Sequence, residues 1–252
     1  MLRLVTIPIS HYCEKARWAL DRAGLPYREV PHVQGIHNVA SRLLGGKGTV
    51  PVLVTHYGAI GESEEIVTWV DAGLPAEQRL FPPEGEARRE VQAVSRRFDE
   101  ELGPRGRRLM YVHMLARPEF ALRFNNVGVP RWEDRAVRWG FPLFRRLINR
   151  VLDIRPGIER EDEAAVWREF DFVADLLSDG RPHLCGEQFG AADMTFAAMS
   201  APVIVPPIYG VPLPQPDILP PDTAALVERG REHPAGRYAL RLYADYRRTR
   251  VV

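Results

Sequence analysis

Apolar and polar residues follow two different periods within the first 30 residues of the chain. Residues 2–7 place branched apolar side chains at alternating positions and stop near Pro8, which predicts a β-strand. Residues 14–23 then show the spacing of an amphipathic helix that ends at Gly24. A further short strand is expected at 27–30. A strand, a helix and a strand in this order form a β-α-β unit, so the two strands are expected to be parallel.

The pattern from residue 34 to residue 85 predicts the rest of a small mixed sheet and its boundary. Residues 34–46 are expected to form a loose, partly helical crossover, and 52–61 a hairpin. A helix is expected over 63–72. Several glycines and prolines then interrupt the pattern, which places a linker at about 73–85.

Beyond the linker the chain is helical in pattern almost throughout. Residues 86–102 and 161–178 carry apolar side chains at helical spacing, and two irregular stretches interrupt the helices, at 125–133 and at the proline-rich segment 202–221. The proline-rich segment is apolar, so we expect it to wrap the helical core. The sequence therefore predicts an α/β domain over 1–73 and an all-helical domain over 86–252.

Composition limits the classes of function. Lys plus Arg (34) and Asp plus Glu (33) leave a net charge of +1, so neither a nucleic-acid nor a membrane partner is expected. The clusters Arg105-Gly106-Arg107-Arg108 and Arg145-Arg146 lie in helix-like stretches and are expected to face solvent. The two cysteines give no disulfide framework, and the start of the chain shows no signal-peptide pattern. A reducing, cytoplasmic setting is expected.

Candidate chemistry begins where the first strand meets the first helix. Ser10 and Cys13 stand at the helix start, where unpaired N–H groups and the helix dipole would stabilise a thiolate. Ser10 could equally be a simple helix cap, and Cys13 a small buried residue. His11 is expected to be an exposed turn residue, and Lys15 and Arg17 are candidates for holding an anion.

Two later segments add to this site. Val50-Pro51 begins an apolar strand, where the missing N–H of proline is tolerated. Glu62-Ser63 places an acid and a hydroxyl at the start of a helix, a common helix-start pattern that could also bind a charged ligand. The histidines show no metal-ligand spacing, so no metal site is expected.

These segments in this order resemble the cytosolic glutathione transferases. The N-terminal part of the resemblance consists of S-x-x-C at Ser10–Cys13, T-V-P-V-L at 49–53 and Glu62-Ser63. Residues 186–197 are similar to the buried capping segment of that family's helical domain, with Gly190 at the cap and Asp193 three residues later. The resemblance covers most of the chain except about 103–160, which matches no pattern of the family.

The resemblance implies a thioredoxin-like α/β domain followed by a helical domain, and a detoxifying transferase that uses glutathione without a metal. In it, Ser10 donates to the glutathione thiolate, and a cis Val50-Pro51 bond lets the Val50 backbone pair with the cysteinyl part of glutathione. Glu62 and Ser63 hold the γ-glutamyl end. The acceptor is a small electrophile bound between the domains, where a few polar and aromatic side chains are candidates: Tyr111, His113, Met114, Phe120, Phe124 and Trp132. A homodimer is expected from the resemblance.

Two other functions are compatible with the same residues. Cys13 could carry glutathione-dependent thiol–disulfide reduction, although the position of the first cysteine of a C-x-x-C motif is occupied by Ser10. The fold could also serve as a non-catalytic carrier of an apolar ligand such as haem, because a fold does not fix a function.

Overall fold

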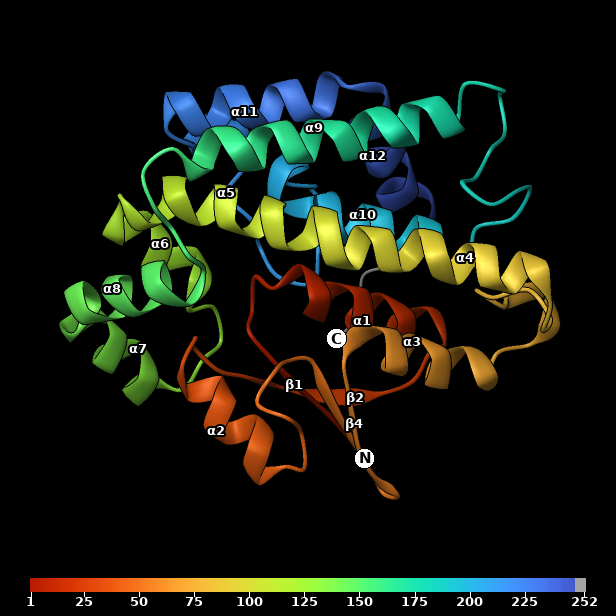
Figure 1. Cartoon of the computed structure of the whole chain (residues 1–252). Coiled ribbons are helices and arrows are strands. Elements are labelled where there is room, and N and C mark those ends of the chain that lie inside the picture. Colours follow the sequence, from red (N-terminus) through yellow and green to blue (C-terminus); the bar gives the residue numbers. More distant parts are fainter. Residues whose placement is uncertain (248–252) are drawn as a thin grey trace.

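The computed structural model describes residues 1–247 and begins with a four-stranded sheet (Figure 1). Its strand order is β2-β1-β3-β4. The parallel pairing of β1 with β2 and the antiparallel β3–β4 hairpin confirm the prediction. The elements of this part are β1 (Leu2–Thr6), α1 (His11–Arg22), β2 (Tyr27–Pro31), α2 (Ile36–Leu43), β3 (Val52–Thr55), β4 (Gly58–Gly61) and α3 (Ser63–Ala72).

Helices α1 and α3 lie between the sheet and the central helices, whereas α2 lies below α7 (Arg131–Trp139), and its Ile36 packs against an apolar cluster formed mainly by residues 115–148 (Figure 1). Leu4 and Leu53 are opposite each other in the β1–β3 pair and both are fully buried. Apolar residues on both neighbouring strands give the sheet a face that the helices can cover. This is the thioredoxin-like α/β architecture expected for the N-terminal part.

Residues 73–85 contain no α-helix or strand, only the short 3-10 turn η1 (Ala76–Gln78). From residue 86 the described chain is helical. The elements are α4 (Glu86–Arg97), η2 (Phe98–Leu102), α5 (Gly103–Leu115), α6 (Pro118–Asn125), α7 (Arg131–Trp139), α8 (Phe141–Val151), α9 (Ile158–Leu176), α10 (Ala191–Ile204), η3 (Pro216–Ile218), α11 (Pro221–Glu232) and α12 (Pro234–Tyr246).

Helices α4 and α5 form one nearly continuous rod across the molecule (Figure 1). The predicted helix over 86–102 therefore continues to Leu115, through a π-helical turn at Phe98–Leu102. Pro104 does not stop it because the proline stands in the first turn of α5, where a missing N–H is tolerated. The rod extends from Glu86, directly after the linker, to Leu115.

Helix α10 is the buried centre of the helical part. All its residues except Pro202 are buried. As predicted, Gly190 is its cap, and the Asp193 carboxylate accepts hydrogen bonds from the N–H groups of Gly190 (2.8 Å) and Leu184 (2.9 Å). Because glycine has no side chain, this is the one half of the capping box that can form. The Asp193 carboxylate also accepts from the buried Tyr238 hydroxyl.

The proline-rich segment does more than wrap helices. Its first proline, Pro202, belongs to the last turn of α10, and the irregular part that follows crosses to the start of α1. There the Tyr209 hydroxyl donates to the carbonyl of Ile9 (3.1 Å), and the Gly210 N–H donates to the Glu14 carboxylate (2.9 Å). The segment therefore fixes the helix start at which Ser10 stands.

Candidate functional site: a cavity at the start of α1

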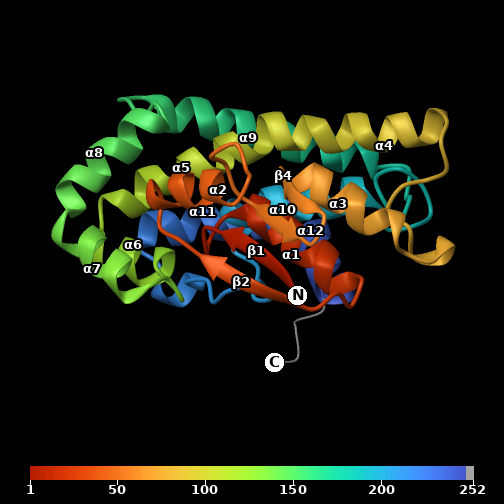
Figure 2. The ribbon, with the colours of Figure 1, turned by 90° about the horizontal axis from the view of Figure 1, so that it is seen from below.

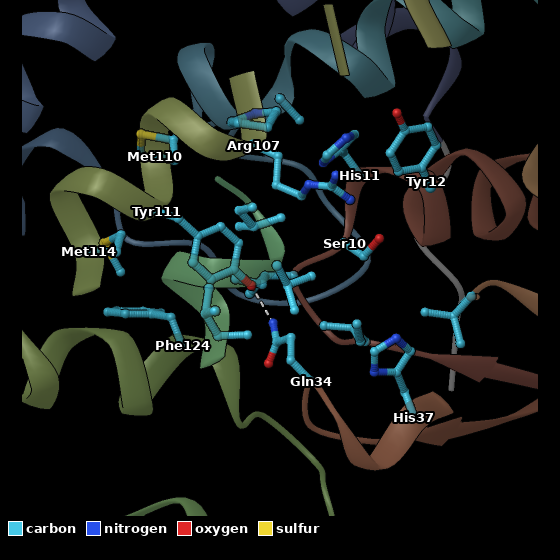
Figure 3. Close-up of a pocket in the computed structure, with 18 of the residues that line it drawn as sticks. Ser10, His11, Tyr12, Gln34, His37, Arg107, Met110, Tyr111, Met114 and Phe124 are labelled. Carbon is cyan, nitrogen blue, oxygen red and sulfur yellow. Dashed lines mark hydrogen bonds between the residues drawn. The ribbon is translucent and has the colours of Figure 1, made fainter. Parts of the chain in front are cut away.

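A cavity of about 480 Å³ lies where the sheet part meets the helical part (Figure 3). This volume is in the range of sites for small organic ligands. Its walls come from the β1–α1 connection, the segment before β3, and helices α5, α6 and α8. The proline-rich segment closes another side with Val205, Tyr209, Leu213 and Pro214.

Ser10 is the N-cap of α1 and lines this cavity. Its hydroxyl oxygen accepts a hydrogen bond from the N–H of Cys13 (3.4 Å). A hydroxyl that accepts one bond still has its proton to donate. Ser10 can therefore cap the helix and donate to a ligand in the cavity at the same time.

Cys13 points into the protein rather than into the cavity. The residue is fully buried, and burial raises the pKa of its thiol to about 11. The Arg17 charge and the Ser10 hydroxyl act in the opposite direction but are outweighed. The expectation that the helix start would stabilise a Cys13 thiolate is thus not met, because the loss of hydration exceeds the effect of the helix end.

His11 differs from the prediction of an exposed turn residue. It is only 2% exposed and lines the cavity, and burial together with the Arg107 charge lowers the pKa of its imidazole to about 3. A neutral imidazole cannot donate a proton as an imidazolium. Its Nε2 atom is buried without a hydrogen-bond partner among the described residues.

The other polar residues of α1 are used inside the protein. Lys15 pairs with Asp99 (2.6 Å), and Arg17 pairs with Glu29 (2.6 Å), both at 1% side-chain exposure. They therefore do not hold a ligand. The Tyr12 hydroxyl donates to the Asp99 carbonyl (2.7 Å), which leaves Ser10 as the hydroxyl with a proton to spare at this helix start.

Of the residues expected to hold glutathione, Val50 lines the cavity together with Thr49. The Val50-Pro51 bond is cis, as expected. Glu62 and Ser63 stand just outside the cavity lining, and the Thr49 hydroxyl donates to the Glu62 carboxylate (2.8 Å). The structure thus links the start of α3 to the Thr49-Val50 segment at the cavity.

Glu62 has a backbone conformation that few residues other than glycine adopt. Its φ is 54° and its ψ is 138°, and it stands immediately before the first turn of α3. Such conformations cost on the order of 1–3 kcal/mol and are concentrated at functional sites. Ser63 begins α3 and is 5% exposed, so its N–H lies at the positive end of that helix.

Three of the side chains suggested for the acceptor site line the cavity, namely Tyr111, Met114 and Phe124. The other three do not, and Trp132 is 61% exposed on α7. The sequence reasoning missed Met110 and the apolar residues of α8, because 103–160 matched no pattern. The helical spacing of Leu147, Ile148 and Val151 was the available signal.

Arg107 is a further residue that the sequence reasoning placed wrongly. It was expected to face solvent, but it lines the cavity and its guanidinium extends from α5 toward His11 and Ser10 (Figure 3). Its Nε is buried and has no hydrogen-bond partner among the described residues. The neighbouring Arg108 is also engaged, through a bidentate ion pair with buried Asp162. Arg145 and Arg146 are exposed, as predicted.

A scan of family models matches residues 4–78 to the glutathione S-transferase N-terminal domain. The matched region contains Ser10, Val50, Glu62 and Ser63. A search of curated proteins finds no match.

Solved structures with the same fold include several glutathione transferases. One from Ceriporiopsis subvermispora, in complex with glutathione, has a TM-score of 0.66 at 18% identity and covers 100% of this chain and 99% of its own. One from Xanthobacter autotrophicus Py2 has a TM-score of 0.64 at 18% identity, covering 97% and 93%. One from Rhodospirillum rubrum F11 has a TM-score of 0.58 at 21% identity, covering 100% and 97%.

These likenesses extend over both parts of the chain, so the helical part and the sheet part together have the arrangement seen in those structures. In the part of the chain that the structure describes, no helix has the length and apolar character needed to span a membrane. Within the same residues, no cluster of three or more potential metal ligands is present.

Proposed function

We propose that this chain, which has a glutathione S-transferase N-terminal domain and the fold of glutathione transferases, binds reduced glutathione and transfers it to a small electrophile. The observation that carries the proposal is the convergence of Ser10 and Val50 on one cavity, although 40 positions separate them in the sequence.

Each residue of the proposed site has one task. Ser10 donates a hydrogen bond to the glutathione sulfur and so favours its thiolate form, and the positive end of α1 acts in the same direction. The N–H and C=O of Val50, next to Pro51, pair with the cysteinyl backbone. The Glu62 carboxylate binds the ammonium group of the γ-glutamyl end, and Ser63 with the start of α3 binds its carboxylate.

The chemical step is a nucleophilic attack. The sulfur of the bound thiolate forms a bond to an electrophilic carbon, and the leaving group departs with its electron pair or, in an addition, the new carbanion takes a proton from water. The thiol proton goes to solvent. Lowering the thiol pKa by two units requires about 2.7 kcal/mol of preferential stabilisation of the thiolate. In a partly dry cavity, the hydrogen bond from a hydroxyl and the effect of a helix start together supply a free energy of that magnitude.

The alternative chemistry through Cys13 receives no support from the geometry. A thiol with a pKa of about 11 and no exposed surface is a poor nucleophile. If the protein were instead a non-catalytic carrier of an apolar ligand, it would show no response to glutathione.

Together with the transferase function, we propose a detoxifying role and a cytoplasmic location. We also propose a homodimer, which light scattering on the purified protein tests.

The test of the proposed function is calorimetric titration with reduced glutathione. The native chain is expected to bind, and Glu62→Ala is expected to weaken binding about tenfold or more, because an ammonium–carboxylate hydrogen bond is lost. Glu65→Ala is the matched control on α3, since Glu65 is exposed and one turn further along. Absence of binding by the native chain would overturn the transferase proposal.

A further inference from the structure

We propose that Arg107 is the binding residue for a negative charge on the acceptor substrate, so that this protein selects apolar electrophiles that carry a carboxylate or a comparable anion. The inference rests on the proposed function for the reaction. The anion site itself depends only on the charge and lining of the cavity.

The first observation is that the Arg107 charge has no counterion among residues 1–247. Its Nε is buried without a hydrogen-bond partner, and no described carboxylate lies within ion-pair distance of its guanidinium. The neighbours Arg105 and Arg108 on the same helix both pair with Asp162. Only the Nε of this guanidinium is buried and the Arg107 side chain is partly exposed at the cavity wall, so a ligand anion there can supply the partner that no described residue provides.

The second observation is the composition of the cavity. Among the described residues that line it, Arg107 is the only Lys, Arg, Asp or Glu. The histidine next to it, His11, is neutral because burial and the Arg107 charge lower its pKa to about 3. The cavity thus contains a single positive charge in mainly apolar surroundings, where the attraction for an anion is weakly screened.

The third observation is the position of Arg107 between the two halves of the site. On α5 it is followed at helical spacing by Met110, Tyr111 and Met114, which form an apolar wall. At its other end the guanidinium reaches toward Ser10 and His11 (Figure 3). A molecule that packs on the apolar wall with its anion at Arg107 would occupy the same cavity as the sulfur that Ser10 holds in the proposed function.

The test uses a matched pair of ligands, 4-chloro-3-nitrobenzoate and its neutral amide, 4-chloro-3-nitrobenzamide. Their binding to the full chain is measured by calorimetry without glutathione. The native chain is expected to prefer the acid at least about tenfold, as a charge-assisted hydrogen bond would give. Arg107→Met is expected to abolish the preference, and Arg107→Lys to keep part of it. Arg105→Met removes the same charge from the same helix but outside the cavity, and should leave the preference intact.

Conjugation then links the anion site to the reaction. With glutathione present, the sulfur forms a bond to the ring carbon, the carbon–chlorine bond breaks, chloride leaves and the thiol proton goes to buffer. The ratio of kcat/KM for acid over amide is expected to fall at least about tenfold in Arg107→Met. Any rise in the pKa of bound glutathione, read from thiolate absorbance, affects the acid and the amide equally and therefore cancels in this ratio.

Each other outcome has a defined meaning. Equal binding of acid and amide by the native chain would overturn the anion site. A raised thiolate pKa in Arg107→Met with an unchanged acid-to-amide ratio would also overturn it, since Arg107 would then serve the sulfur. If glutathione does not bind but the acid preference stands, the transferase proposal fails and the anion site remains.

Discussion

At the scale of single residues, the start of α1 combines two uses of one hydroxyl. Ser10 Oγ accepts from the Cys13 N–H and lines the cavity. A helix cap and a thiolate donor need a hydroxyl at the same place, because both depend on the unpaired N–H groups of the first turn. The cap contributes to folding stability and the thiolate donor contributes to the reaction. Measuring both quantities in one substituted protein therefore distinguishes the two roles.

Replacing Ser10 by Ala should therefore have two measurable effects. Loss of the cap is expected to lower the free energy of unfolding by ~1 kcal/mol in urea denaturation. Loss of the donor is expected to raise the pKa of bound glutathione and to lower kcat/KM about tenfold or more. Ser10→Thr keeps the hydroxyl and is the control for both. A change in stability with unchanged conjugation would leave Ser10 as a cap alone.

His11 should make the protein less stable as the pH falls. Its pKa is about 3 in the folded chain, because of burial and the Arg107 charge, whereas an unfolded histidine titrates near 6.5. Between these values the unfolded chain binds more protons, so the free energy of unfolding decreases as pH falls from about 6.5 toward 3. Burial also lowers the pKa values of His37 and His183, which act in the same direction.

His11→Gln should reduce this slope by at most ~1.4 kcal/mol per pH unit, the contribution of one proton. The measurement is urea unfolding at several pH values between 5 and 7. His56→Gln, at an exposed turn between β3 and β4, is the control and should leave the slope as in the native chain. An unchanged slope in His11→Gln would show that His11 is not buried as a neutral group.

At the scale of elements, the local pattern of apolar and polar residues predicted the features that depend on contacts between residues close in sequence. The parallel pairing of the first two strands, the hairpin and the long helices follow from periods of two and 3.6 residues together with glycine and proline positions. The predicted start of the first helix was three residues late, because His11, Tyr12 and Cys13 were counted as the turn. Their polar character is compatible with a first helical turn that packs inward.

Contacts between distant segments could not be predicted in this way. Arg107 and Arg108 are adjacent in sequence, yet one lines the cavity and the other pairs with Asp162, 54 positions later. Tertiary packing decides which face of a helix meets which neighbour. An arginine-rich stretch has the same sequence pattern whether its side chains line a cavity or form buried ion pairs. For the same reason, the apolar spacing of α8 and of the proline-rich segment is visible in the sequence, but their place at the cavity is not.

An ion pair between α5 and α9 is one of the interactions that attach the rod to the neighbouring helices. Asp162 is fully buried and accepts from Arg108 Nε (2.6 Å) and Nη2 (2.7 Å). Asp162→Asn is expected to lower the free energy of unfolding by about 3 kcal/mol, because a half-buried guanidinium loses its charged partner. The neighbouring exposed pair of Glu161 with Arg155 supplies the control, and Glu161→Gln should change stability by less than about 1 kcal/mol.

At the scale of the whole molecule, the predicted boundary at 73–85 separates two parts that share one apolar core. The Trp18 ring on α1 lies 5.9 Å from that of Phe189 and 4.8 Å from that of Tyr243, both in the helical part. Helices α1 and α10 pack directly against each other. Figure 2 shows, from below the view of Figure 1, the sheet in front of the helical part. Neither part covers its own apolar surface alone.

We therefore expect the full chain to unfold in one transition. Tryptophan fluorescence and circular dichroism should give the same midpoint in urea, because opening the contact between the parts exposes buried residues of both. A fragment of residues 1–85 should show no cooperative unfolding, since Trp18 would lose its cover, and Trp18→Ala in the full chain should cost ~3–5 kcal/mol. Two separated transitions, or a fragment that unfolds cooperatively, would show that the linker divides independent units. In that case the cavity would lie between bodies free to move apart, whereas a single transition means that Ser10 and Arg107 are held on opposite walls by the same core.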